Sequence, residues 1–202
     1  MLKPICSAIF AVLIGTAGNA FAAALVGKPA PDFALRDLNG KSVKLADFKG
    51  RHVVLEWHNP NCPFVVKHYD SGNMPSLQSK YDAKDTVWLS INSTNPAHQD
   101  FLGTDKMKQY LAEKKASPDA YLIDAEGKVG IEYAAKTTPH MYLVNPAGTL
   151  VYAGAIDDKR STRLEDVKTA TNYLVAAVDE SKSGKPVTVA STQPYGCSVK
   201  YR

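Results

Sequence analysis

A buried strand that runs directly into a helix start sets the strongest limit on the fold of this chain. Residues 52–57 (His-Val-Val-Leu-Glu-Trp) are almost continuously apolar, as expected for a strand that is covered on both faces of a sheet. Asn59-Pro60-Asn61 breaks the strand, and Pro63 follows where the first turn of a helix tolerates a missing N–H group. We expect a helix from Cys62 to about His68, with Asn61 as its cap.

The rest of the sequence predicts an alternation of strands and helices around this unit. Asn39-Gly40 predicts an N-terminal hairpin, and residues 145–148 predict a second hairpin near the end of the domain. The elements expected between them are a resumed helix at 74–81, a strand at 86–91, a helix at 106–115, a strand at 121–123 and a short helix at 129–135. From Leu164 to Val178, apolar residues recur at the spacing of one amphipathic helix. This order predicts a thioredoxin-like three-layer α/β/α sandwich with an N-terminal β-hairpin extension and a C-terminal tail.

The first residues have the pattern of a secretory signal peptide. Lys3 precedes an apolar run from Ile5 to Ala17, and Ala20-Phe21-Ala22 is a small-x-small cleavage pattern. Because the apolar run is too short to span a bilayer, we expect residues 1–22 to be removed and no stable membrane anchor to remain. The predicted product is a periplasmic or secreted protein with one α/β domain at residues 26–180 and a tail at residues 181–202.

The composition and the charge exclude several function classes. Hydrophobic residues make up 45% of the chain and charged residues 22%, which excludes a disordered or multi-span membrane protein. The formal net charge is only +4, and no run of lysines and arginines reaches the length of a basic patch. We therefore expect no nucleic-acid partner.

The cysteines reduce to one pair of interest. Cys6 lies inside the predicted leader, so the mature chain keeps Cys62 and Cys197. In an oxidising compartment such a pair suggests a disulfide, either a structural staple for the tail or a redox-active pair. Unpaired N–H groups and the helix dipole at the start of a helix stabilise a thiolate, which favours Cys62 as a nucleophile. Whether Cys197 is a staple or a resolving thiol stays open at this point.

Three short motifs carry a resemblance to thioredoxin-fold oxidoreductases. Cys62-Pro63-Phe64-Val65 resembles their Cys-Pro-x-Cys active site, with Val65 in place of the second cysteine. Glu56 and Trp57 match the buried acidic residue and the aromatic residue on the strand below the active site. Thr137-Thr138-Pro139 matches the family's cis-proline loop, which faces the reactive cysteine and holds a substrate chain by backbone hydrogen bonds. The resemblance implies substrate-binding roles for Thr138, Pro139, Trp57 and Pro63.

A longer set of motifs is similar to the redoxin family, the AhpC/TSA branch that includes peroxiredoxin-like and TlpA-like proteins. Residues 28–33, 37–41 and 45–50 resemble its N-terminal extension, and the whole resemblance covers residues 26–180. The Cys-Pro-Phe-Val motif resembles that of an exported subfamily. Asn59 stands where peroxiredoxins carry Thr or Ser, and the chain has no arginine between Arg51 and Arg160 to face the cysteine. These departures weaken the case for peroxidase chemistry.

The resemblance implies a thiol oxidoreductase without a cofactor. Cys62 would attack a protein or small-molecule disulfide, or a hydroperoxide, and Glu56, with a pKa raised by burial, would shuttle the proton. Cys197 would resolve the intermediate, and an external thiol donor would reduce the resulting disulfide.

Two other interpretations remain open. The chain would be a non-enzymatic binding or chaperone module if Cys62 and Cys197 form a permanent disulfide. A Sco-like copper site would need His58, His68 and His140 to face one cleft with Cys62. Sco proteins use a Cys-x3-Cys pair that this chain lacks, so we expect no metal.

Overall fold

A seven-stranded sheet forms the centre of the computed structural model, which describes residues 24–81 and 83–202. The strand order is β2-β1-β5-β4-β3-β7-β8. The strands are β1 (Ala34–Asp37), β2 (Ser42–Lys44), β3 (His52–Trp57), β4 (Thr86–Asn92), β5 (Ala120–Ile123), β7 (His140–Val144) and β8 (Leu150–Gly154). The predicted strands and both hairpins are confirmed, whereas the predicted leader at residues 1–22 lies outside the described residues.

The strand that carries Glu56 lies at the centre of this sheet. β3 pairs in parallel with β4, from His52 opposite Thr86 to Trp57 opposite Ile91, and antiparallel with β7 on its other side. Every residue of β3 is buried, as the apolar run predicts.

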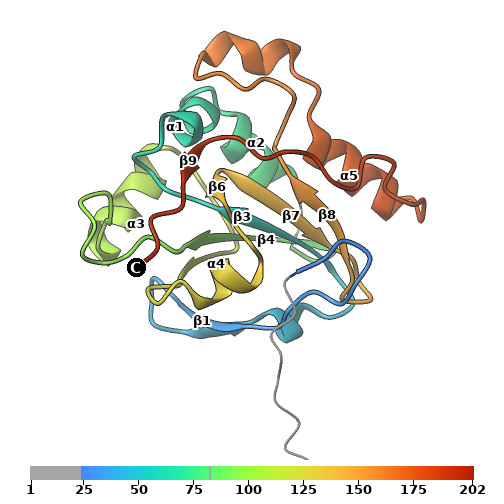
Figure 1. Cartoon of the computed structure of the whole chain (residues 1–202), viewed down its shortest axis with the longest axis horizontal. Helices are drawn as coiled ribbons and strands as arrows, with labels where there is room; N and C mark the ends of the chain where they lie inside the picture. The colour runs from blue at the N-terminus through green and yellow to red at the C-terminus, as the bar shows by residue number, and fades with distance from the viewer. Residues whose placement is uncertain (1–23, 82) are drawn as a thin grey trace, which may run out of the picture.

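Helices cover both faces of the sheet, which gives the predicted three layers (Figure 1). The helices are α1 (Pro63–Asp70), α2 (Asn73–Lys80), α3 (Thr104–Glu113), α4 (Lys128–Glu132) and α5 (Tyr173–Lys182). Side chains of α1, α2 and α5 form one core with Val54 of β3, while α4 packs on the opposite face with Val53 and Leu55. Neighbouring residues of β3 therefore belong to opposite layers, because side chains alternate along a strand.

The single amphipathic helix predicted from Leu164 to Val178 is wrong. The structure has a 3-10 helix at Leu164–Thr169, none of whose residues is buried, and α5 begins only at Tyr173. The Asn172 side chain accepts a hydrogen bond from the Val175 N–H at 2.9 Å and so caps a new helix. A strong N-cap inside the apolar repeat divides the segment in two.

The C-terminal tail crosses the body of the protein instead of projecting from it (Figure 1). Its short strand β9 (Cys197–Ser198) pairs antiparallel with β6 (Thr137–Thr138), a pairing that the sequence did not predict. Within residues 24–81 and 83–202, no helix combines the length and the apolar character that a bilayer span requires.

Candidate active site

Cys62 lies at the start of α1, as predicted, but it is itself the N-cap residue. Its backbone is extended (φ −80°, ψ 121°), and Pro63 is the first helical residue. The prediction that Asn61 caps this helix is wrong. The side-chain amide of Asn61 instead donates to the backbone carbonyl of Asp100 at 3.3 Å. Cys62 is only 1% exposed, so neighbouring residues cover its thiol almost completely.

The cis-proline loop meets Cys62 directly. The Thr138-Pro139 peptide bond is cis, as the resemblance implied. The Cys62 thiol donates a hydrogen bond from Sγ to the Thr138 carbonyl oxygen at 2.9 Å, and both residues are buried. The fold thus brings together two segments of the predicted site that are 76 residues apart in the sequence.

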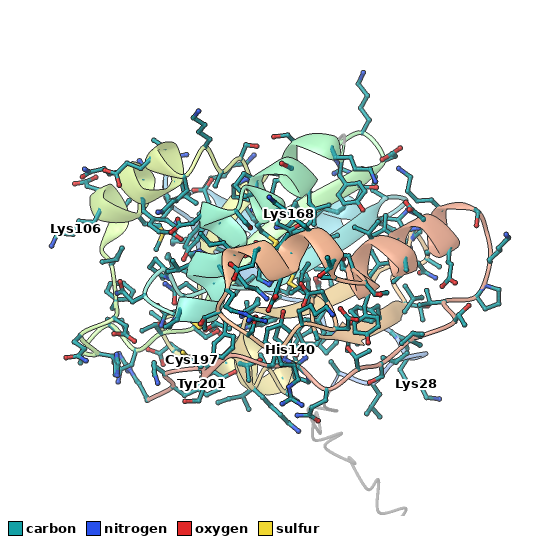
Figure 2. The ribbon with its side chains drawn as sticks, turned by 90° about the horizontal axis from the view of Figure 1, so that it is seen from above. Lys28, Lys106, His140, Lys168, Cys197 and Tyr201 are labelled. Atoms are coloured by element: carbon teal, nitrogen blue, oxygen red, sulfur yellow. The ribbon has the colours of Figure 1, made fainter. Side chains whose placement is uncertain are left out.

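Cys197 lies against the same two residues. It is opposite Thr138 in the β6–β9 register, and its backbone N–H donates to Cys62 Sγ at 3.4 Å. Both cysteines are free thiols, and Cys197, which is labelled in Figure 2, is partly exposed. Burial, and then the hydrogen bond and charge of Cys62, raise the pKa of the Cys197 thiol to about 11. The backbone of Cys197 therefore lies against Cys62, and the Cys197 thiol is protonated at neutral pH.

Glu56 is fully buried and shares the α1 side of the sheet with Cys62. Tyr69 of α1 donates to Glu56 Oε1 at 2.9 Å, while Trp88 and Ser90 donate to Oε2 at 2.8 and 2.9 Å. Burial raises the pKa of this carboxyl, and the donated hydrogen bonds oppose that shift. The buried position agrees with the prediction and excludes a surface carboxylate. The carboxylate is engaged by these donors, and its link to the helix of Cys62 runs through Tyr69.

Trp57 does not join this group. Its indole packs against Tyr133 and Tyr142 on the α4 side of the sheet, and its Nε1 donates to Ser93 Oγ at 3.0 Å. Because adjacent residues of a strand point to opposite faces, Trp57 cannot share the side of Glu56. The substrate-binding role predicted for Trp57 is not supported by this placement.

The three histidines have separate partners, so the structure does not supply the shared cleft that a Sco-like copper site would need. His58 Nδ1 lies 2.9 Å from the Tyr121 hydroxyl, His68 Nε2 lies 3.2 Å from the Tyr195 hydroxyl, and His140 Nδ1 lies 3.0 Å from the Tyr142 hydroxyl. Burial is the main cause that lowers the pKa of each imidazole to about 3. In the described part of the chain, no three His, Cys, Asp or Glu side chains are grouped as metal ligands.

A buried charged cluster beside Cys62 was not predicted. Lys67 Nζ lies 4.0 Å from Asp157 Oδ2, with both side chains at most 1% exposed. Lys67 Nζ also donates to the Tyr195 hydroxyl at 3.2 Å, and that hydroxyl donates to Asp157 Oδ1. The sequence signal that could have indicated this cluster is the Lys67-His68 pair in α1. The buried neighbours of the pair, Val65 and Tyr69, are hydrophobic.

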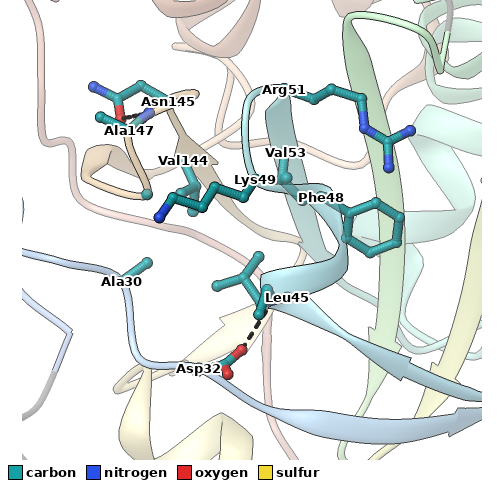
Figure 3. Close-up of a pocket in the computed structure, with 12 residues that line it drawn as sticks. Ala30, Asp32, Leu45, Phe48, Lys49, Arg51, Val53, Val144, Asn145 and Ala147 are labelled. Atoms are coloured by element: carbon teal, nitrogen blue, oxygen red, sulfur yellow. Dashed lines mark hydrogen bonds between the residues drawn. The ribbon is translucent and has the colours of Figure 1, made fainter.

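An apolar pocket lies at the opposite end of β3 from Cys62. Its lining includes Leu45, Phe48 and Val144 together with the basic residues Lys49 and Arg51 (Figure 3). None of the predicted site residues lines this pocket. The predicted site residues Cys62, Thr138 and Cys197 meet instead at the contact between α1, the cis-proline loop and the tail.

Comparison with known proteins agrees with this geometry. A family model described as the AhpC/TSA family matches residues 26–153. The thiol-disulfide oxidoreductase ResA of Bacillus thuringiensis subsp. konkukian is 31% identical over 126 residues, which cover 56% of this chain and 72% of ResA.

Two solved structures extend the comparison to the fold. A hypothetical protein from Sinorhizobium meliloti 1021 is 25% identical, with a TM-score of 0.74 over 89% of this chain and 96% of that one. The thioredoxin domain of a thiol-disulfide oxidoreductase from Bacteroides vulgatus has a TM-score of 0.52, covers 73% of this chain and 98% of its own, and is 23% identical. The predicted thioredoxin-like fold is confirmed.

Proposed function

Because this chain belongs to the AhpC/TSA family, we propose that it is a thiol-disulfide oxidoreductase with Cys62 as its nucleophile and Cys197 as its resolving cysteine. The observation that carries the proposal is the β6–β9 pairing, which sets the Cys197 backbone N–H 3.4 Å from Cys62 Sγ. A thiol held at this position can attack an intermediate on Cys62 without a large movement of the body of the protein.

The proposed exchange takes two steps. The Cys62 thiolate attacks one sulfur of a substrate disulfide, forms a mixed disulfide and releases the first substrate thiolate. Cys197, after losing its proton, attacks the Cys62 sulfur, so that the Cys62–Cys197 disulfide forms and the second substrate thiolate leaves. The substrate gains two electrons, and an external thiol donor returns the protein to its dithiol form.

A hydroperoxide would enter the same cycle at its first step. Attack of the Cys62 thiolate on the peroxide, with uptake of one proton by the leaving oxygen, gives a sulfenic acid and an alcohol, or water from hydrogen peroxide. Condensation with the Cys197 thiol then gives the same disulfide and releases water. Asn59 at the position of the usual Thr or Ser favours disulfides over hydroperoxides as substrates.

The residues around the pair receive supporting roles. Thr138 offers its carbonyl to the Cys62 thiol and, with Pro139 and Pro63, forms the edge along which a substrate chain would lie. Glu56 acts through Tyr69 and is assigned to proton transfer below the site. Trp57 is left out because it faces the other layer.

Single-cysteine variants test the proposal. Cys62→Ser should abolish reduction of insulin disulfides, whereas Cys197→Ser should still complete the first step and accumulate a mixed disulfide on Cys62. Parallel assays with insulin and a hydroperoxide identify the preferred substrate class. A Cys62→Ser variant with full activity would refute the proposal. A wild-type disulfide that glutathione does not reduce would favour the stapled binding module instead.

The proposal includes export of the mature chain. The support is the sequence pattern of residues 1–22, which precedes the domain at residues 26–180 and the tail at residues 181–202. Mass spectrometry of the protein recovered from periplasmic and culture fractions should find a chain that begins at Ala23. Retention of residues 1–22 in the recovered protein would contradict export by cleavage.

A further inference from the structure

The tail occupies the edge of the cis-proline loop that a substrate chain would be expected to use. Cys197 and Ser198 pair with Thr138 and Thr137, and the Val199 N–H continues the contact by donating to the Lys136 carbonyl at 3.1 Å. Two features determine which chain fits this edge. One is a buried polar site that receives the side chain of Tyr195, and the other is the backbone at Gly196.

The polar site is formed by Lys67, His68 and Asp157, and we call it the phenol site. All three side chains are at most 2% exposed, and Tyr195 is 4% exposed. The phenol oxygen receives a hydrogen bond from Lys67 Nζ at 3.2 Å and lies 3.2 Å from His68 Nε2, while its proton goes to Asp157 Oδ1. The Tyr195 hydroxyl thus links all three groups of the site.

The protonation states of His68 and Tyr195 match a neutral phenol in this site. The Asn73 amide lies 2.9 Å from His68 Nδ1, so Nε2 carries the proton that is donated to the phenol. Burial and the Lys67 charge lower the pKa of His68 to about 3, so the ring is neutral. Burial and the Asp157 carboxylate raise the pKa of Tyr195, which keeps the phenol protonated. A phenylalanine would leave Asp157, Lys67 and His68 each short of one partner.

Position 196, directly after Tyr195, accepts only glycine. Its φ of 144° lies in the range that favours glycine, and a Cβ there would stand 2.0 Å from the Thr138 carbonyl oxygen. The oxygen in question is the acceptor of the Cys62 thiol. The edge therefore accepts a cysteine only when glycine precedes it, with a tyrosine one position earlier.

We propose that the phenol site is a recognition site for Tyr195, and that it makes the chain's own tail the preferred occupant of the cis-proline edge. This inference rests on the proposed function, because the tail delivers Cys197 to Cys62. It adds a rule of specificity: a Tyr-Gly-Cys strand is selected, and the tail shields Cys62 from chains that lack it.

Protection of Cys62 in the reduced full chain tests the inference without catalytic turnover. The rate at which N-ethylmaleimide modifies Cys62 is followed by peptide mass spectrometry. Tyr195→Phe should raise this rate at least about tenfold. This is the lower end of the range expected when a hydrogen bond to a charged group is lost. The matched control is Tyr133→Phe, which removes a hydroxyl that donates to the Pro31 carbonyl at 2.6 Å, outside the phenol site. This control should stay within about twofold of the wild type.

A second pair of variants tests the glycine position. Gly196→Ala should expose Cys62 at least as strongly as Tyr195→Phe does. Gly184→Ala is its control, because Gly184 also has a positive φ of 74° but has open space where a Cβ would stand. In the Gly196→Ala protein, a peptide of residues 193–201 with Cys197→Ser should restore protection. The same peptide with Tyr195→Phe in addition should need an about tenfold higher concentration.

The outcomes separate this inference from the proposed function. Wild-type modification rates in Tyr195→Phe would overturn the inference, and so would equal acceleration in Tyr195→Phe and Tyr133→Phe, which would indicate a general loss of stability. Equal potency of the two peptides would also overturn it. Retained activity of Cys62→Ser would refute the proposed function but would leave the protection results unchanged.

Discussion

Replacing Lys67 with methionine should destabilise the protein far more than replacing Lys114, although Lys114 forms the shorter ion pair. Lys114 Nζ lies 2.5 Å from Asp70 Oδ1, and the two side chains are 30% and 35% exposed. Lys67 Nζ lies 4.0 Å from Asp157 Oδ2, and those side chains are 0% and 1% exposed. Distance alone ranks the surface pair first, whereas burial reverses the order.

The magnitudes follow from what each change leaves behind. Lys114→Met leaves Asp70 in contact with water, and exposed ion pairs contribute about 0–1 kcal/mol. Lys67→Met keeps most of the aliphatic packing but removes the hydrogen bonds to the Lys159 carbonyl and the Tyr195 hydroxyl. It also leaves the Asp157 carboxylate buried without its cation. Breaking a buried pair in this way costs about 3–5 kcal/mol.

Urea unfolding under reducing conditions measures these costs, with far-UV circular dichroism as the probe. The reductant excludes any contribution of a Cys62–Cys197 disulfide to the free energy of unfolding. A double-mutant cycle with Asp157→Asn should show that the Lys67→Met and Asp157→Asn costs are not additive, by about 0.5–3 kcal/mol. Equal or greater destabilisation by Lys114→Met would refute the reasoning, and so would additive costs in the cycle.

Three further predictions concern pH and packing. Burial raises the pKa of Glu56 in the folded protein, so above about pH 4.5 the folded protein holds a proton that the unfolded chain releases. The free energy of unfolding of the wild type should therefore fall as the pH rises above about 4.5. Glu56→Gln should abolish this fall. Unfolding across pH 4–8 tests this, and an unchanged slope, or the same change in the exposed control Glu165→Gln, would contradict it. Alkylation of Cys197 in the reduced wild type should show a midpoint near pH 11, and Cys62→Ser should lower it, since burial and then Cys62 raise that pKa; the same midpoint in both proteins would show that Cys62 has no part in the shift. Gly130→Ala should release the end of the tail, because a Cβ there would stand 2.5 Å from the Tyr201 hydroxyl; unchanged hydrogen exchange of residues 198–202 would refute this.

The unit of β3 and α1 was predictable because its signals are local. The apolar run, the Asn-Pro-Asn break and Pro63 all lie within a few residues of Cys62, so pattern and propensity agree at each position. Central placement of β3 then fixed the burial of Glu56. The placement of Trp57 on the opposite face of the sheet from Glu56 was also predictable, since side chains alternate along a strand.

The position of Cys197 was not predictable from the sequence. β9 has two residues, too few for any periodicity, and its partner Thr138 lies 59 positions earlier in the sequence. The helix expected from Leu164 failed for a different reason. Its apolar spacing is genuine, but the segment contains Asn172, a residue type that caps helices well. Because the Asn172 side chain accepts a hydrogen bond from the Val175 N–H, a new helix begins there instead of one continuous helix.

One short helix positions both thiols of the proposed exchange. Cys62 is the N-cap residue of α1, and Lys67 and His68 in the body of α1 hold Tyr195, two residues before Cys197. The relative position of the two thiols therefore varies only as far as one helix and one short strand can move. Rigid elements of this kind hold reacting groups at a defined distance. The buried charges of the phenol site cost stability unless the tail is present. The same contacts that satisfy those charges bring Cys197 to Cys62, so we expect docking of the tail and readiness for exchange to be one coupled equilibrium.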